Sequence, residues 1–153
     1  MSGVILYNGS DIAVPEPQIR TNGHYKDFGY GFYCTNIKKQ AVRWALTRGG
    51  KSVLNRYLFA EDKRLKSLCF PKMTDSWLDF IVHCRRGFHH SYDIVEGPMA
   101  DDTIWDFVED FANGRIKRQV FWSYAEFKYP THQIVFCTEK ALRCLSFAGS
   151  KTL

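Results

Sequence analysis

The pattern of apolar and polar positions predicts short strands mixed with short helices. Apolar or alternating runs indicate strands at 4–7, 32–35, 52–59, 92–95, 133–137 and 144–147, with one more short strand within 65–70. Asn8-Gly9-Ser10 reads as a turn after the first strand. Residues 11–30 have no clear periodicity, and a loop of this length in a compact domain is usually functional.

Apolar residues at helical spacing predict the helices. Trp77, Phe80, Ile81 and Cys84 follow the offsets i, i+3, i+4 and i+7, behind Thr74 or Asp75 as the cap. Other helices are expected at 37–47, from 101 or 102 to 112, and at 116–127, with one helical turn at 138–142. Because strands and helices do not alternate regularly, the chain is expected to be α+β, with a single domain at 1–153.

Composition narrows the class of protein. The 153 residues are 45% hydrophobic and 24% charged, as in ordinary soluble proteins, and the net charge of +5 favours anionic partners. The five cysteines include no C-x-x-C pair, which argues against disulfides and structural zinc, so no metal is expected. The first residues lack the features of a signal peptide and no apolar run has the length of a membrane span, so a cytoplasmic location is expected.

Common catalytic motifs are missing from the sequence. It contains no P-loop, no G-x-G-x-x-G, no G-x-S-x-G and no H-E-x-x-H. What remains is polar residues at the ends of predicted strands, in the segments 6–10, 27–35 and 132–136. These segments are the candidates for a binding site.

These segments resemble the ADP-ribosyltransferase superfamily of diphtheria-toxin-like and poly(ADP-ribose) polymerase-like enzymes. Gly31-Phe32-Tyr33-Cys34-Thr35-Asn36, with a helix and Trp44 after it, is similar to their nicotinamide-binding segment. Leu6-Tyr7-Asn8-Gly9-Ser10 resembles their first-strand motif, and Gln133-Ile134-Val135-Phe136 their late strand. The chain also resembles a bacterial toxin-like family with the patterns L-Y-H-G-S, D-F-G-x-G-F-Y, G-P-x-A-D-D and F-x-T-E-K-A-L, the last two appearing at 97–102 and 136–142.

The resemblance implies a split core of two mostly antiparallel sheets with short flanking helices, and NAD+ as substrate. Backbone groups of Gly9 would pair with the carboxamide, since a residue without Cβ permits a close approach. Tyr33 and Trp44 would enclose the pyridinium ring, with Phe32 beside them. Gln133 would meet the nicotinamide ribose and, with Tyr33, carry the catalytic roles.

Other positions complete the implied site. Asn8 and Ser10 would hydrogen-bond a ribose hydroxyl, and Arg20 would meet the pyrophosphate as a bidentate donor. For several residues a structural role competes with the functional one. Trp44 lies on an apolar helix face, Asp101 and Asp102 suit a helix cap, and Glu139 suits a helix start, although a carboxylate at any of these three acidic positions is an alternative catalytic group.

Two positions depart from the superfamily pattern. Asn8 stands where the superfamily has histidine, and asparagine still donates and accepts hydrogen bonds. Gln133 stands where the superfamily has its catalytic glutamate. A glutamine orients a hydroxyl but carries no negative charge, and losing that charge costs on the order of a hundredfold in rate.

The sequence therefore predicts NAD+-dependent mono-ADP-ribosyl transfer to an unidentified macromolecule, a protein or a nucleic acid. The resemblance also implies a toxin with a small antitoxin protein as partner. One alternative is a non-enzymatic module that binds NAD+ or another nucleotide, which Asn8 and Gln133 favour. A further alternative is a nucleic-acid-modifying enzyme that uses the same pocket, whose affinity for nucleic acid would fall steeply with salt.

Overall fold

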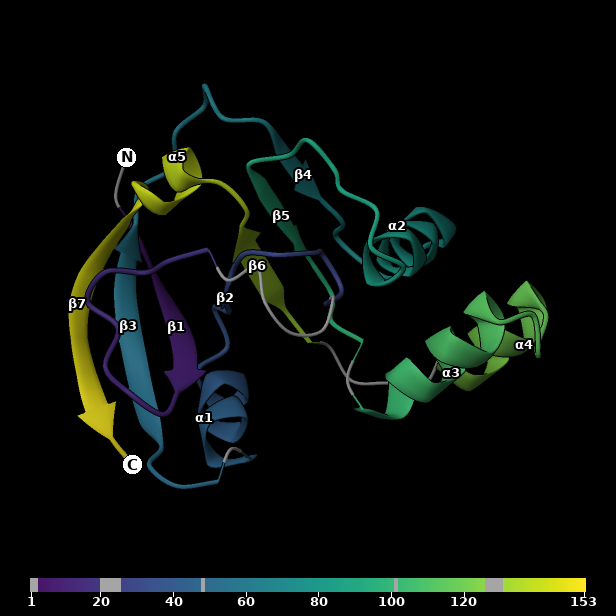
Figure 1. The fold of residues 1–153 in the computed structure, drawn as a ribbon, viewed down its shortest axis with the longest axis horizontal. Coiled ribbons are helices and arrows are strands. Elements are labelled where there is room, and N and C mark those ends of the chain that lie inside the picture. Colours follow the sequence, from purple (N-terminus) through teal and green to yellow (C-terminus); the bar gives the residue numbers. More distant parts are fainter. Residues whose placement is uncertain (1–2, 20–25, 48, 101, 126–130) are drawn as a thin grey trace.

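The protein folds into two sheets with five helices around them in the described part of the chain (Figure 1). The structure, a computed structural model, describes residues 3–19, 26–47, 49–100, 102–125 and 131–153. The strands are β1 (Val4–Ser10), β2 (Phe32–Cys34), β3 (Val53–Phe59), β4 (Ser67–Cys69), β5 (Ile94–Gly97), β6 (Gln133–Phe136) and β7 (Leu145–Thr152). The helices are α1 (Lys38–Thr47), α2 (Asp75–Arg85), α3 (Asp102–Ala112), α4 (Arg118–Ala125) and α5 (Glu139–Leu142).

The strands form a three-stranded sheet, β1-β3-β7, and a four-stranded sheet, β2-β6-β5-β4. All neighbours are antiparallel except β4 and β5, which are parallel. One isolated bridge, between Tyr7 and Thr35, joins β1 of the first sheet to the chain just after β2 of the second. The prediction of an α+β fold with two mostly antiparallel sheets is confirmed.

Two apolar cores result from the two faces of the four-stranded sheet. Phe32, Ile134 and Phe136 point from one face into the core shared with Leu6 and Tyr57 of the other sheet. The opposite face packs against α2, α3 and α4, through residues that include Val95, Val135, Trp77, Ile104 and Phe121. Because successive strand residues point to opposite faces, β2, β5 and β6 each supply residues to both cores.

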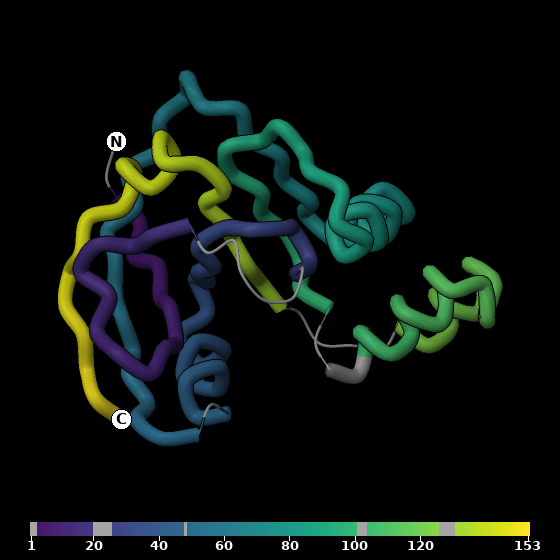
Figure 2. The backbone as a smooth tube through the Cα atoms, in the orientation of Figure 1, coloured from purple at the N-terminus to yellow at the C-terminus, as the bar shows by residue number. Residues whose placement is uncertain are grey.

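The helices lie at different edges of the molecule. Helix α1 packs on β1 and β3 of the smaller sheet, whereas α3 and α4 pack on each other and extend away from it (Figure 1). The segment that follows β1 crosses the smaller sheet (Figure 2), where Val14 accepts a hydrogen bond from the Tyr57 hydroxyl and donates one to Asn55. No helix in the described ranges is long and apolar enough to span a bilayer.

Some predicted boundaries are confirmed and others are wrong. Thr74 caps α2 by accepting a hydrogen bond from the Trp77 N–H, as its position before the apolar stripe predicts. Asn8, Gly9 and Ser10 are not a turn but the last residues of β1, because they pair with the strand residues 53–55 of β3. The pairing partner lies far along the chain, so the local turn signal gives way to tertiary contacts.

Candidate functional site

The end of β1 offers free backbone groups at Gly9. The N–H and C=O of Tyr7 bond to Thr35, so they point away from β3. Backbone groups two residues apart on a strand point the same way, and those of Gly9 therefore also face the outer edge of β1. Within the described ranges no hydrogen bond joins Gly9 to another residue on that edge. A planar amide of a ligand is able to pair with this edge as a neighbouring strand would.

Helix α1 closes one side of this strand end. A Cβ on Gly9 would lie 2.2 Å from the Ala41 carbonyl oxygen and 2.7 Å from the Ala45 nitrogen, so only glycine permits this packing. The Cβ of Trp44 is 3.1 Å from the same point. Trp44 is partly exposed.

Asn8 ties this strand end to the second sheet. Its Nδ2 donates to the Tyr33 carbonyl oxygen at 2.9 Å, and its Oδ1 accepts from Asn55 at 3.4 Å. Ser10 is buried and its hydroxyl bonds locally to Asp11 at 3.3 Å. The structure therefore brings Asn8 against β2, but the contact uses the Tyr33 backbone rather than its ring.

Phe32 and Tyr33 point to opposite faces of β2. Phe32 is buried between the sheets, edge-on to Tyr57 with ring centroids 5.5 Å apart. The Tyr33 hydroxyl donates to the Gly29 carbonyl oxygen at 2.7 Å and accepts from the Phe28 N–H at 3.1 Å. Burial, with a smaller contribution from Asp27, raises the pKa of Tyr33 well above its usual value, so the ring is held as a neutral phenol.

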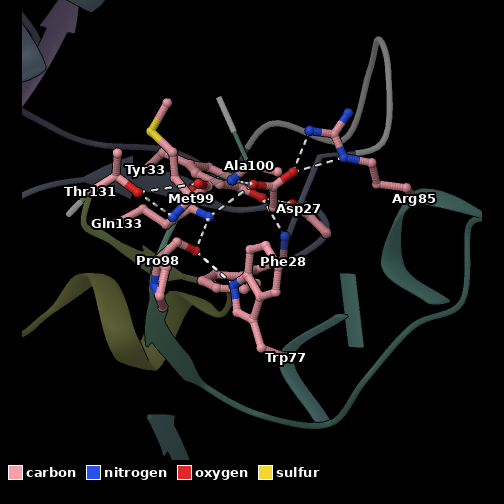
Figure 3. A network of polar contacts seen from close by, with 11 residues as sticks. Asp27, Phe28, Tyr33, Trp77, Arg85, Pro98, Met99, Ala100, Thr131 and Gln133 are labelled. Atoms are coloured by element: carbon pink, nitrogen blue, oxygen red, sulfur yellow. Dashed lines mark hydrogen bonds and ion pairs between the residues drawn. The ribbon is translucent and has the colours of Figure 1, made fainter. Parts of the chain in front are cut away.

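Gln133 belongs to a buried polar network (Figure 3). Its Nε2 donates to Asp27 Oδ2 at 3.0 Å and to the Pro98 carbonyl oxygen at 3.3 Å. Both N–H groups of the amide are thereby engaged, so a ligand hydroxyl at Gln133 can be met only by Oε1. The turn at Asp27–Gly29 thus contacts both predicted catalytic residues, Gln133 through its first residue and Tyr33 through the two that follow.

Asp27 is a fully partnered buried carboxylate. Its exposed fraction is only 4%, and Oδ2 also accepts from the Ala100 N–H at 2.8 Å. Oδ1 accepts from Arg85 Nε at 2.7 Å and from the terminal guanidinium nitrogen of the same residue. The Arg85 guanidinium lies in turn 3.3 Å from the centre of the Trp105 ring. Since an unpaired buried charge is costly, these contacts fix the position of the carboxylate and, through it, of the Gln133 amide.

The predicted residues fall into two groups. Asn8, Gly9 and Trp44 lie around the end of β1 and α1, whereas the side chains of Tyr33 and Gln133 lie on the α2 side of the larger sheet. Ser10, the buried last residue of β1, follows Gly9 at the same strand end, whereas Phe32 is buried in the core between the sheets. Arg20 and Asp101 lie outside the described residues. Glu139 is the exposed first residue of α5, behind the capping residue Thr138.

Four polar residues that the structure places near the predicted site had no individual role in the sequence-based prediction, although Asp27 and His132 lie in its candidate segments. Asp27 and Arg85 form the network above, and Glu96 pairs with His132 at 2.7 Å. Glu96 lies one position beyond the strand predicted at 92–95, whereas the structure places it within β5 (Ile94–Gly97), so the sequence did not mark it as a charged residue inside a strand. Asp27 and Arg85 are separated by 58 positions, and nothing local in the sequence predicts their contact.

An open depression occurs elsewhere on the surface. It is lined by residues 60–65 and by Lys140, Arg143 and Cys144, and none of the described residues predicted to bind NAD+ borders it. Arg64 in this wall is neutralised by Asp62 through a bidentate pair. Its charges are mixed and its side chains form no catalytic arrangement, so the site is assigned to the ends of β1 and β6 instead. The described part of the chain holds no group of three or more side chains suited to a metal ion.

The fold is that of a small α+β protein with two mostly antiparallel sheets, and the candidate polar groups lie at the ends of strands in both sheets. The chain belongs to the family described as "Protein of unknown function (DUF3990)", whose model matches residues 4–147. The match covers all seven strands at least in part, so the described fold is that of the family domain. No curated protein and no solved structure matches the chain significantly.

Proposed function

We propose that the protein transfers ADP-ribose from NAD+ to a macromolecule. The observation that supports this best is the free backbone edge at Gly9, close to the Cβ of a partly exposed tryptophan, Trp44. A nicotinamide carboxamide pairs with one N–H and one C=O, and its cationic ring stacks on a flat aromatic face. Gly9 and Trp44 offer these two features side by side.

The strand pairing between β1 and β2 ends after one bridge. Continuing the antiparallel register from the Tyr7–Thr35 bridge would place Gly9 opposite Tyr33, yet β1 and β2 belong to different sheets and no strand pairing continues there in the described residues. The Asn8 amide spans the diverging strands instead. A flat ligand ring entering between them would meet Gly9 on one side and the chain around Tyr33 on the other.

The reaction balances without a cofactor beyond NAD+ itself. The bond between the ribose C1′ and the nicotinamide nitrogen breaks, and its electron pair neutralises the pyridinium. A lone pair of the acceptor forms the new bond to C1′, and the acceptor loses one proton. Positive charge builds on the sugar during this exchange, so a nearby negative group accelerates it.

Incubation with NAD+ labelled in its adenylate phosphate, together with cell lysate, tests the proposal. We expect label on a macromolecule and release of free nicotinamide. Trp44→Ala removes the stacking face and is expected to weaken NAD+ binding about tenfold, a loss typical of one aromatic contact. Leu46→Ala, on the exposed side of the same helix, is the matched control and leaves binding unchanged. No label and no nicotinamide from the unmodified protein would contradict the proposal.

A binding module that holds NAD+ or another nucleotide without turnover is the second candidate. The observation that favours it is the engagement of Gln133 with Asp27 and Pro98, which resembles a structural brace. Calorimetry separates the two candidates, because the module binds NAD+ and releases no nicotinamide.

A further inference from the structure

A carboxylate–imidazole pair lies on the face of the larger sheet opposite Gln133. Glu96 Oε2 and His132 Nε2 are 2.7 Å apart, with exposed side-chain fractions of 38% and 14%. In the β5–β6 register Glu96 pairs with Ile134, whose side chain faces the core between the two sheets. The carboxylate therefore reaches solvent from the inter-sheet side, while Gln133 faces Asp27.

The hydrogen bonds of His132 assign its tautomer. Nδ1 accepts from the Asn36 N–H at 3.0 Å, so the proton of a neutral ring is on Nε2 and is donated to Glu96. Thr35 Oγ1 lies 3.3 Å from the same Nδ1. Both ring nitrogens are thus occupied. His132 holds the carboxylate in place, and Glu96 keeps further lone pairs to accept a proton from elsewhere.

Helix α1 links this pair to the proposed nicotinamide site. The side-chain amide of Gln40 bonds to the His132 peptide, with His132 N to Gln40 Oε1 at 3.1 Å. Gln40 and Trp44 are one turn apart and lie on the same face of the helix. These bonds place His132, the partner of Glu96, beside the face of α1 that carries Trp44, whereas Glu96 and Gln133 lie on opposite faces of the larger sheet.

We propose that Glu96 is the catalytic base that takes the proton of the acceptor, and that His132 is its positioning residue; this inference rests on the proposed function. As the acceptor lone pair bonds to the ribose C1′ and nicotinamide departs with the old bonding pair, the proton passes from the acceptor to a Glu96 oxygen. A carboxylate acceptor has no proton to lose. The acceptor of this protein therefore carries an O–H or N–H bond at the reacting atom.

Glu96→Gln tests the role of the charge. The amide oxygen still accepts from His132, so the fold is preserved, and the urea midpoint of unfolding verifies this. We expect the rate of transfer to fall at least about a hundredfold, the usual lower range for a general base, while the Kd for NAD+ measured by calorimetry changes less than about threefold. Glu109→Gln, an exposed glutamate on α3, is the control and leaves both quantities unchanged.

His132 is tested by two variants that differ in one hydrogen bond. His132→Gln places an N–H donor near the former Nε2 and retains a substantial part of the rate, whereas the shorter His132→Asn does not reach Glu96 and loses most of it at an unchanged Kd. Equal rates for these two variants would remove the positioning role of His132. Transfer within about threefold of the unmodified rate in Glu96→Gln would overturn the inference about Glu96 and leave the proposed function standing. An unmodified protein that neither binds nor cleaves NAD+ would overturn both.

Discussion

Gln133→Glu is the substitution that most directly probes the buried network. It exchanges the Nε2 group, 3.0 Å from Asp27 Oδ2 and 3.3 Å from the Pro98 carbonyl oxygen, for a carboxylate oxygen. The Nε2 group donates hydrogen bonds to two acceptor oxygens, whereas the carboxylate oxygen that replaces it is itself an acceptor and forms neither bond. Because Gln133 is 3% exposed, water cannot screen the new contact. The same change introduces the glutamate that the resemblance to ADP-ribosyltransferases implies at this position, so the buried network and the resemblance lead to opposite expectations.

The magnitude follows from two competing costs. Two unit charges about 3 Å apart repel by about 5 kcal/mol at an effective dielectric constant of about 20. Protonating the introduced carboxyl instead costs about 4 kcal/mol at pH 7, since the ordinary pKa of glutamate is about 4.3 and each unit is worth about 1.4 kcal/mol. The smaller of these two energies sets the loss of stability, because the protein adopts the protonation state of lower free energy. Attraction between the introduced carboxylate and Arg85 reduces the loss further. The free energy of unfolding is therefore expected to fall by about 2–4 kcal/mol at pH 7.

The pH dependence gives the sharper test. Repulsion by Asp27 raises the pKa of the introduced carboxyl in the folded protein above its value in the unfolded protein. At pH values between these two pKa values, the folded state therefore binds more protons than the unfolded state. Stability relative to the unmodified protein is then lost as pH rises through that interval and is largely recovered at pH 5, where the protonation cost is about 1 kcal/mol. Urea unfolding at pH 5 and pH 7.5 measures the difference.

The control for this experiment is Gln133→Met, which removes the same hydrogen bonds without adding charge. Its loss of unfolding free energy is expected to be about equal at both pH values, because no titrating group is introduced. The electrostatic reasoning about Asp27 would be refuted if Gln133→Glu were as stable as the unmodified protein at pH 7.5. It would also be refuted if Gln133→Glu lost as much unfolding free energy at pH 5 as at pH 7.5. Restored transfer activity in a stable Gln133→Glu protein would in addition contradict the assignment of the base to Glu96.

Three further outcomes are expected. Gly9→Ala lowers the free energy of unfolding by about 2 kcal/mol or more, because the new Cβ would lie 2.2 Å from a carbonyl oxygen of α1. A thermal melt measures the loss, and an unchanged melting temperature would contradict the packing. Asp93→Asn destabilises the protein at pH 7 by about 1–2 kcal/mol, and the difference shrinks below pH of about 4, because the pKa of this carboxyl is lowered, chiefly by the Lys66 N–H; urea midpoints against pH measure it. A disulfide reagent at pH 8 modifies the exposed Cys69 first and Cys34 only on unfolding, since Cys34 is fully buried and burial raises its thiol pKa; mass spectrometry identifies the order.

The regular elements were largely predictable because their signals are local. The strand at 133–137 and the helix after Thr74 appear where apolar spacing and a capping residue place them. The last strand was predicted at 144–147 but extends to Thr152, because its polar second half is held by pairing with β3 rather than by an apolar face. The length of this strand is set by its pairing within the sheet, so the hydrophobic pattern of the segment alone does not predict it.

The site was predictable only as a set of separate residues. Tyr33 and Gln133 were named from their strands, and the turn at Asp27–Gly29 contacts both in the structure. The contact between Asp27 and Gln133 spans 106 positions, so no spacing rule connects the two residues. Successive residues of a strand point to opposite faces of the sheet, so only every second residue can face a ligand on one side. For this reason Phe32 points into the core between the sheets although Tyr33 is its neighbour in the sequence.

The amide at position 133 has a physical reason within this chain. Asp27 already holds a buried negative charge that Arg85 and the Ala100 N–H balance, and its remaining need is a neutral donor, which a glutamine supplies and a glutamate does not. If the protein transfers ADP-ribose as proposed, the negative charge that favours this reaction would come from a carboxylate outside this network. Glu96 is the carboxylate that we propose, because the imidazole of His132 holds it in place and 38% of its side chain is exposed. The glutamine at position 133 and the proposed base Glu96 on β5 then have a common explanation, because the buried charge of Asp27 disfavours a second carboxylate at position 133.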